Sequence, residues 1–297
     1  MIKEIAKKIL PEKYIRKYKA EKQEQRKRSF DSIPALSLDD FRDLLNNHFG
    51  ISKGDTVFIH SSLDNLKLGF DIKEMLPLLL DTVGPEGTLL FPTYPHLPSY
   101  EYLKSGEVFN VRRTPSFTGF LSEIARRHRD SVRSLHPTKS VAAIGKYARE
   151  LTAGHHLSAY PYDSSSPYYK AMELNAKSIG IGVTSNYFSS THIVDDYLKS
   201  KFPVEVYHSE LFRARCIDWD GNETIVETYA HNIRKMKFDI PAYFNKYIPQ
   251  ETARDFRFGS MNFFIVNSRP LFDKMLKLAE KNITIYKRIY YKMNRLL

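Results

Sequence analysis

The sequence has only one cysteine, Cys216, among its 297 residues. An internal disulfide is therefore excluded, and this composition is typical of a protein from a reducing compartment. No apolar run approaches the ~18 residues that a transmembrane helix requires. The first residues also lack the apolar stretch and the small-residue cleavage site of a secretory signal peptide. We therefore expect a cytoplasmic protein.

Acidic residues are scarce at both ends of the chain. The net charge is +11, and residues 1–30 hold 11 Lys and Arg against 4 Glu, while residues 281–297 hold 5 Lys and Arg and no acid. The rest of the chain is close to neutral. A nucleic-acid-binding protein usually carries its basic surface on the folded body, so nucleic acid is not an expected partner. The sequence predicts a basic extension and linker (1–36), a folded domain (37–280) and a basic tail (281–297).

The basic ends have two interpretations. Apolar residues at positions 2, 5 and 9 are typical of an amphipathic helix. Such a helix and a basic tail would suit peripheral contact with the anionic inner face of a membrane. Alternatively, the extension is a charged helix that packs on the body or on a second subunit of a homodimer. The sequence leaves both interpretations open.

The order of predicted elements indicates an α/β fold. Ser37 and Asp40 form a capping-box pattern before a helix that reaches about residue 49. Strands are predicted at 56–60, 88–91, 141–144, 178–183 and 261–266, and helices at 73–83, 117–129, 191–200 and 269–280. A hairpin is expected around Asp220-Gly221-Asn222. We expect a mixed sheet, partly parallel and partly antiparallel, flanked by helices in α/β/α layers.

A histidine precedes a proline at the mouth of one predicted strand. Pro137 biases His136 toward an extended conformation, and the apolar strand 141–144 follows at once. Histidine changes charge near neutral pH, so an imidazole held at the mouth of a buried strand is a candidate proton acceptor. The alternative is an ordinary loop histidine.

Three other segments accompany this motif. Residues 54–63 read as a turn, a strand and a polar loop, residues 113–123 as a helix start, and residues 190–197 place His192 and Asp195 on one helical face. Taken together and in this order, the four segments resemble the aminoglycoside 3-N-acetyltransferase family. Connecting pieces at 83–89, 165–168 and 178–183 match as well, and the resemblance covers roughly residues 38–275.

The resemblance implies an acyltransferase domain that moves an acetyl or other short acyl group from coenzyme A to an amine. Because an ammonium ion has no lone pair, such an enzyme needs a base near neutral pH. His136 fits the base, and Asp195, with His192 beside it, is the best candidate to orient the imidazole. The family pattern has Glu where this chain has the shorter Asp195, and Asp196 is a second acid that could take the role. The alternative is that both acids only favour a helix N-terminus.

The resemblance also implies a place for acetyl-CoA. In the family, the loop that matches His60, Ser61, Ser62 and Leu63 lines the cofactor channel. Pro115 at the first turn of a predicted helix would leave Thr114, Ser116 and Phe117 at a helix N-terminus, which suits phosphate or carbonyl groups. The alternatives are a simple helix cap and a polar loop that satisfies its own backbone.

No metal site is predicted, since the sequence has no short His-x-His or His-x₃-His spacing.

Enzymes of the family that act on polycationic drugs call for a strongly acidic cleft, and this chain has no acid-rich stretch. We therefore expect an amino sugar linked to a nucleotide or a lipid diphosphate, as in surface polysaccharide biosynthesis. The alternatives are an aminoglycoside antibiotic and a non-catalytic, membrane-associated member of the fold.

Overall fold

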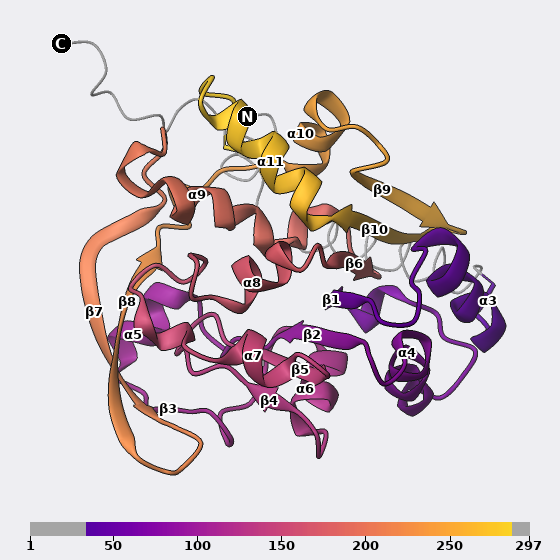
Figure 1. The fold of residues 1–297 in the computed structure, drawn as a ribbon, viewed down its shortest axis with the longest axis horizontal. Helices are drawn as coiled ribbons and strands as arrows, with labels where there is room; N and C mark the ends of the chain where they lie inside the picture. The colour runs from indigo at the N-terminus through magenta and orange to yellow at the C-terminus, as the bar shows by residue number, and fades with distance from the viewer. Residues whose placement is uncertain (1–33, 287–297) are drawn as a thin grey trace, which may run out of the picture.

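A mixed seven-stranded sheet forms the centre of the computed structural model, which describes residues 34–286 (Figure 1). Predictions for residues 1–33 and 287–297 lie outside the described residues. The strand order is β4-β5-β2-β1-β6-β10-β9. The strands are β1 (Thr56–Ser61), β2 (Thr88–Pro92), β4 (Val132–Arg133), β5 (Val141–Gly145), β6 (Lys177–Ile181), β9 (Ala253–Phe258) and β10 (Met261–Asn267).

The middle of this sheet is parallel and its outer strands are antiparallel. Strand β1 pairs in parallel with both β2 and β6, while β5 runs antiparallel to β2 and β10 runs antiparallel to β6. Every residue of β1 and β2 is buried, as expected for strands covered on both faces. The predicted mixed sheet is confirmed.

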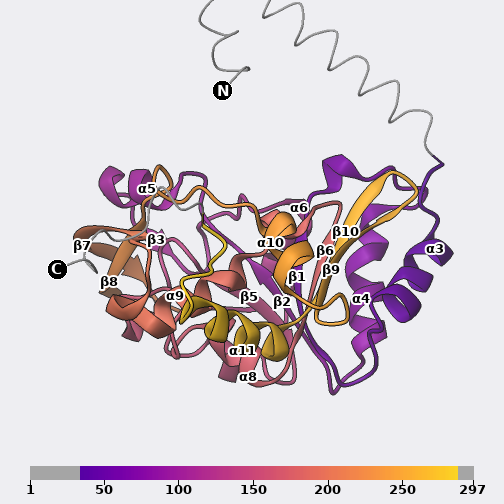
Figure 2. The ribbon, with the colours of Figure 1, turned by 90° about the horizontal axis from the view of Figure 1, so that it is seen from above.

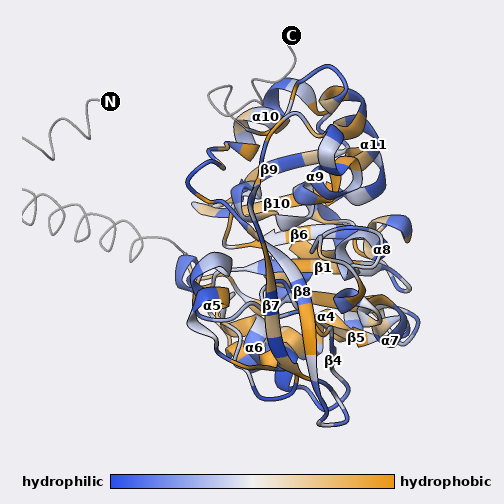
Figure 3. Cartoon of the chain, turned by 90° about the vertical axis from the view of Figure 1, so that its left-hand side faces the viewer, coloured by the Kyte–Doolittle hydropathy of each residue, from blue (hydrophilic) through white to orange (hydrophobic). Residues whose placement is uncertain are grey.

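Helices cover both faces of the sheet. On one face, Val57, Ile59 and Leu89 pack with α3 (Leu38–Asp43), α4 (Met75–Val83) and α6 (Phe120–Arg127). On the other face, Phe58 and Leu90 point the opposite way because successive strand residues alternate. They belong to a core that includes α7 (Ala148–Thr152), α8 (Pro167–Glu173), α9 (Ile193–Leu198), α10 (Ile240–Tyr247) and α11 (Ser268–Ala279). Figure 3 shows hydrophobic residues on the central strands between these layers.

A second, three-stranded sheet lies at the end of the molecule opposite α3 and α4 (Figures 1 and 2). It consists of β3 (Phe109–Asn110), β7 (Tyr207–Ile217) and β8 (Glu223–His231), and α5 (Ser99–Ser105) packs beside it. The turn between β7 and β8 is held by Asp218, whose carboxylate accepts from the backbone N–H groups of Asp220 and Asn222. The predicted hairpin is therefore confirmed, and its two long strands reach back toward α9.

Helix α6 begins later than predicted. The helix starts at Phe120, with Gly119 as its N-cap, so Thr114 and Ser116 lie in the preceding irregular segment. Gly119 has φ 114°, and a Cβ there would lie 2.7 Å from the backbone oxygen of Ser61. Only glycine allows this conformation and this close approach, so the helix start is set by contact with the end of β1.

The two ends of the described chain belong to the folded body. Ser37 and Asp40 form the predicted capping box at α3. Residues 281–286, which the sequence placed in a basic tail, pack against the body, and Tyr286 is buried. Within residues 34–286, no helix has the length and apolar character needed to cross a membrane.

Candidate active site

A cavity of about 450 Å³ opens where the three parallel strands end. It is lined by residues at or just beyond the carboxyl ends of β1, β2 and β6, together with residues 117–119 before α6. Open sheets with parallel strands bind ligands at this edge, because the loops that follow the strands gather there. We call this the strand-end cavity.

The predicted cofactor residues divide into two groups in the structure. His60, Ser61, Ser62 and Phe117 line the strand-end cavity. The other three, Leu63, Thr114 and Ser116, are not among its lining residues. The Thr114 hydroxyl instead accepts from the backbone N–H of Asn110, and the Ser116 hydroxyl bonds that of Thr118.

Several residues of this cavity were missed by the sequence analysis. They are Asp64, Pro92, Tyr94, Thr118, Gly119, Val183, Tyr187 and Ser189. The proline-rich run 92–98 signalled only an irregular segment. Nothing local indicated that Tyr94 and Ser189, 95 positions apart, lie on the same cavity.

His60 is a neutral imidazole with one unpaired nitrogen. Burial lowers its pKa to about 3, and its Nε2 accepts from the backbone N–H of Ser189 at 3.4 Å. The proton is therefore on Nδ1, which has no hydrogen-bond partner among residues 34–286. The ring is a potential donor beside the strand-end cavity.

His192 and Asp195 form a buried pair at the start of α9. The Nδ1 of His192 lies 2.9 Å from Oδ2 of Asp195. The hydroxyl of Tyr286 donates to the same Oδ2 and lies 2.9 Å from the histidine Nδ1. Burial raises the pKa of Asp195, and the hydrogen bonds from His192 and Tyr286 oppose that rise. The shorter aspartate therefore does reach a histidine in this chain.

The structure does not bring His136 to Asp195. The ring is fully buried, and its Nδ1 accepts from the backbone N–H groups of Thr138 and Lys139. Its proton therefore lies on Nε2, which faces the hydroxyl of Thr228 at 3.3 Å. Burial lowers the pKa of His136 well below its usual value. The lone pair of the ring is engaged by these two backbone donors, so His136 is poorly placed to take up a proton.

Asp196 has a different set of partners. Its carboxylate accepts from the backbone N–H of Tyr162 and from the hydroxyl of Tyr207, both at 2.7 Å. Burial raises its pKa well above the usual range. Asp196 therefore holds two tyrosines in place, whereas Asp195 faces the histidine.

A group of stacked rings surrounds His192. The His231 ring lies 4.7 Å from it and stacks on Tyr207 at 4.6 Å, with 9° between the planes. The Tyr162 ring lies 5.3 Å from His192, and its hydroxyl is 3.4 Å from that of Tyr94 in the strand-end cavity. Nε2 of His231 has no hydrogen-bond partner among the described residues. His231, which the sequence analysis did not single out, thus links the pair to the hairpin.

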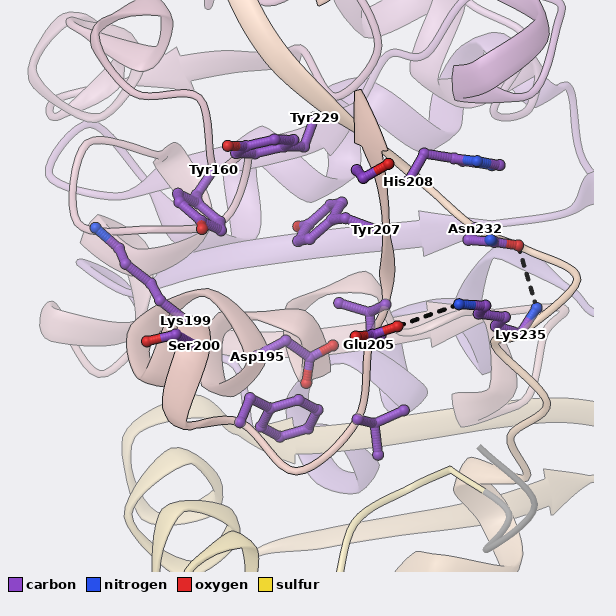
Figure 4. A pocket seen from close by; sticks show the side chains of 14 residues that line it. Tyr160, Asp195, Lys199, Ser200, Glu205, Tyr207, His208, Tyr229, Asn232 and Lys235 are labelled. Atoms are coloured by element: carbon purple, nitrogen blue, oxygen red, sulfur yellow. Dashed lines mark hydrogen bonds and ion pairs between the residues drawn. The ribbon is translucent and has the colours of Figure 1, made fainter. Parts of the chain in front are cut away.

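A second cavity of about 490 Å³ lies beside Asp195 and Tyr207 (Figure 4). Its lining includes Asp195, Tyr207 and Tyr229, and much of it comes from β7 and the segment before it; we call it the hairpin cavity. Its other charged residues are Lys199, Glu205 and Lys235, and Lys235 pairs with Glu205 at 3.2 Å. The cavity is therefore not acidic.

No group of three or more His, Cys, Asp or Glu side chains within residues 34–286 is placed to hold a metal ion. Cys216, near the end of β7, faces a small buried core, where burial raises its thiol pKa to about 12. A thiol in that state is not a nucleophile.

The layers and the strand-end cavity define an α/β protein of the kind that binds small ligands at the edge of its sheet. A sequence model of the aminoglycoside 3-N-acetyltransferases matches residues 58–280. The chain belongs to this family.

Curated relatives are distant and match only in part. The aminoglycoside N(3)-acetyltransferase III of Salmonella sp. is 26% identical over 160 residues, which are 49% of this chain and 56% of that protein. The aminoglycoside N(3)-acetyltransferase VII of Streptomyces paromomycinus is 28% identical over 148 residues, or 45% and 51% of the two chains. The chain thus spans about half the length of the curated relatives it matches.

Solved structures share the fold. A binary complex of AAC-IIIb with CoASH has a TM-score of 0.68 at 17% identity, over 84% of this chain and 98% of that one. AAC-VIa bound to sisomicin has a TM-score of 0.68 at 19% identity, over 84% and 99% of the two chains. The predicted family and fold class are confirmed.

The buried histidines predict that the protein is destabilised by mild acid. Burial lowers the pKa of His60 and His155 to about 3, and lowers those of His136 and His231 as well. The unfolded chain takes up these protons near pH 6.5, and the folded chain does not. The unfolding free energy should therefore fall as the pH drops from 6.5 to 5, by about 2 kcal/mol per histidine. Urea unfolding across this range measures the slope.

His155→Gln should make this slope shallower by about one proton. Glutamine can replace the contacts of His155 with the Ser134 hydroxyl and the Pro161 carbonyl but does not titrate. The matched control is His156→Gln, at the exposed neighbouring histidine, which should leave the slope unchanged. Parallel curves for His155→Gln and the wild type would contradict the assignment.

Proposed function

We propose that the protein is an acetyl-CoA-dependent N-acetyltransferase that acts on the amine of an amino sugar. The observation that carries this proposal is the buried pair of His192 and Asp195, which contacts the lining of one cavity directly and that of the other through Tyr162. Burying a carboxylate against a histidine is costly, and such a pair next to a cavity is a candidate for acid–base chemistry. The names of the relatives support the same reaction.

The strand-end cavity suits the pantetheine arm of coenzyme A. Its lining contains one acid, Asp64, and neither Lys nor Arg. The phosphates of the cofactor would therefore lie outside it, and the uncharged arm within. Phe117 and Tyr187 are 64% and 67% exposed at this cavity, and apolar rings left in water commonly mark a ligand surface.

His192 acts as the general base in this proposal. With Nδ1–H directed at Asp195, the lone pair of the ring is on Nε2, and Asp195 stabilises the imidazolium that forms. The amine nitrogen attacks the thioester carbon, and its proton passes to Nε2. The C–S bond then breaks, the proton returns to the sulfur, and the products are an N-acetyl amine and coenzyme A.

The acceptor has two candidates. The matched family and the relatives favour an aminoglycoside, and they support this acceptor better than a role in polysaccharide biosynthesis. A second candidate, an amino sugar that carries phosphate, is favoured by the charge of the hairpin cavity. Its two lysines balance its two acids: Lys235 pairs with Glu205, and Lys199 lies 3.9 Å from Asp163 outside the lining. The lining therefore offers no excess negative charge to a polycation.

His192→Ala should lower kcat roughly 10²- to 10⁴-fold with little change in the KM for acetyl-CoA, because a base acts mainly in the transition state. His136→Ala should instead lower the unfolding free energy and change kcat far less. Free-thiol release from acetyl-CoA measures both variants. If His136→Ala lost the greater part of kcat while folded, His136 would be the base and this assignment would fail.

Phe117→Ala combined with Tyr187→Ala should raise the KM for acetyl-CoA about tenfold or more, since each ring would lose buried contact with the arm. The value of kcat should change little. Phe120→Ala is the matched control, because Phe120 is 58% exposed on α6 but does not line the cavity. Equal KM values for the double variant and the control would place the cofactor elsewhere.

An acceptor comparison separates the two candidates. We expect a phosphate-bearing amino sugar to be acetylated with a higher kcat/KM than sisomicin or kanamycin at low ionic strength, because the hairpin cavity does not attract polycations. Lys235→Ala should reduce that preference. An advantage of tenfold or more for the aminoglycoside, about 1.4 kcal/mol in the transition state, would leave the aminoglycoside as the acceptor.

A further inference from the structure

Tyr286 places the end of the described chain inside the candidate active site. Its side chain is 4% exposed. The hydroxyl donates to Oδ2 of Asp195 and lies 2.9 Å from Nδ1 of His192. More than 90 residues separate it from this pair, and it falls in a segment that the sequence analysis assigned to a basic tail.

The surrounding structure fixes the direction of this hydroxyl. The backbone of Tyr286 forms an antiparallel bridge with Phe238. Its ring meets Phe238 edge-on at 6.2 Å and Phe202 edge-on at 6.0 Å, and lies nearly parallel to His192 at 6.3 Å. Because three rings confine it, the tyrosine has little rotational freedom, and its O–H stays directed at the carboxylate.

We propose that Tyr286 is a positioning residue that holds the Asp195 carboxylate against Nδ1 of His192. This role deepens the proposed function and rests on it. A donor on Oδ2 keeps the carboxylate from rotating away, and the carboxylate in turn keeps the proton on Nδ1 and the lone pair on Nε2. The buried phenol does not ionise near neutral pH, so it remains a donor: burial and the adjacent Asp195 raise its pKa well above its usual value.

The length of the acid explains why this chain uses such a donor. The family resemblance implies Glu at the position of Asp195, and aspartate is one methylene shorter. A shorter side chain has fewer orientations that reach the ring, so a second contact from another segment restores a unique geometry. The C-terminal segment supplies that contact, and a protein shortened before residue 286 would lose it.

Tyr286→Phe tests the role with least disturbance, because the ring and its packing remain. We expect kcat to fall roughly 10- to 100-fold, as for the loss of a hydrogen bond to a charged group, with an unchanged KM for acetyl-CoA. The matched control is Tyr243→Phe, at a buried tyrosine of the same core, which should keep kcat. A Tyr286→Phe enzyme with kcat within twofold of the wild type would overturn the proposal.

A double-mutant cycle separates positioning from a merely structural role. If Tyr286 acts through Asp195, then Tyr286→Phe should change kcat little in an Asp195→Asn background, because the two residues act as a unit. Additive losses of kcat, accompanied by equal losses of thermal stability, would show that the hydroxyl only supports the fold, and the proposal would fail.

The state of the His192 ring gives a readout that does not depend on catalysis. Nitrogen NMR of the labelled imidazole should show one tautomer, protonated on Nδ1, in the wild type and a mixture in Tyr286→Phe. A wild type that releases no thiol from acetyl-CoA with any amine would refute the proposed function, while the tautomer would still report on Tyr286. An active wild type with the same tautomer in both proteins would refute only the role of Tyr286.

Discussion

Two adjacent carboxylates buried on α9 are the constraint around which this site is organised. Removing a carboxylate from water is costly unless donors replace the water. Asp195 receives a hydrogen bond from Tyr286 and faces Nδ1 of His192, whereas Asp196 accepts from the Tyr162 backbone and the Tyr207 hydroxyl. These donors come from three other parts of the chain. The hydrogen bonds to the two acids therefore connect three segments to α9: the loop before α8, the hairpin and the C-terminal segment.

The parallel centre of the sheet supplies the other half of the site. Because β1, β2 and β6 run in the same direction, the loops that follow them meet at one edge and leave a cavity there. Burial keeps His60 neutral beside this cavity, and the same effect keeps His136 and His231 neutral in the core. Several histidines thus lie close together without mutual repulsion, at the expense of stability in acid.

The two cavities differ in a way that suits two different ligands. The strand-end cavity has exposed aromatic rings and neither Lys nor Arg in its lining, which fits an uncharged, flexible arm. The hairpin cavity has two lysines and no unpaired acid, although polycationic acceptors would call for excess negative charge. In the proposed reaction, the pair and the tyrosine that supports it act on the ligand of the hairpin cavity, which Asp195 lines.

The amino-acid sequence by itself determined the α/β alternation, the capping box at Ser37, the β7–β8 hairpin and the placement of His192 and Asp195 on one helical face. All of these depend on residues close together in the chain, whose spacing sets their geometry. The tertiary structure decided the rest. His136 matched a motif, yet its Nδ1 lone pair accepts hydrogen bonds from the backbone of its own loop. Helix α6 begins at Phe120, after Gly119, because the end of β1 lies close to that glycine. Tyr286 and His231 reach the site only through long-range packing, so no local sequence pattern predicts their positions.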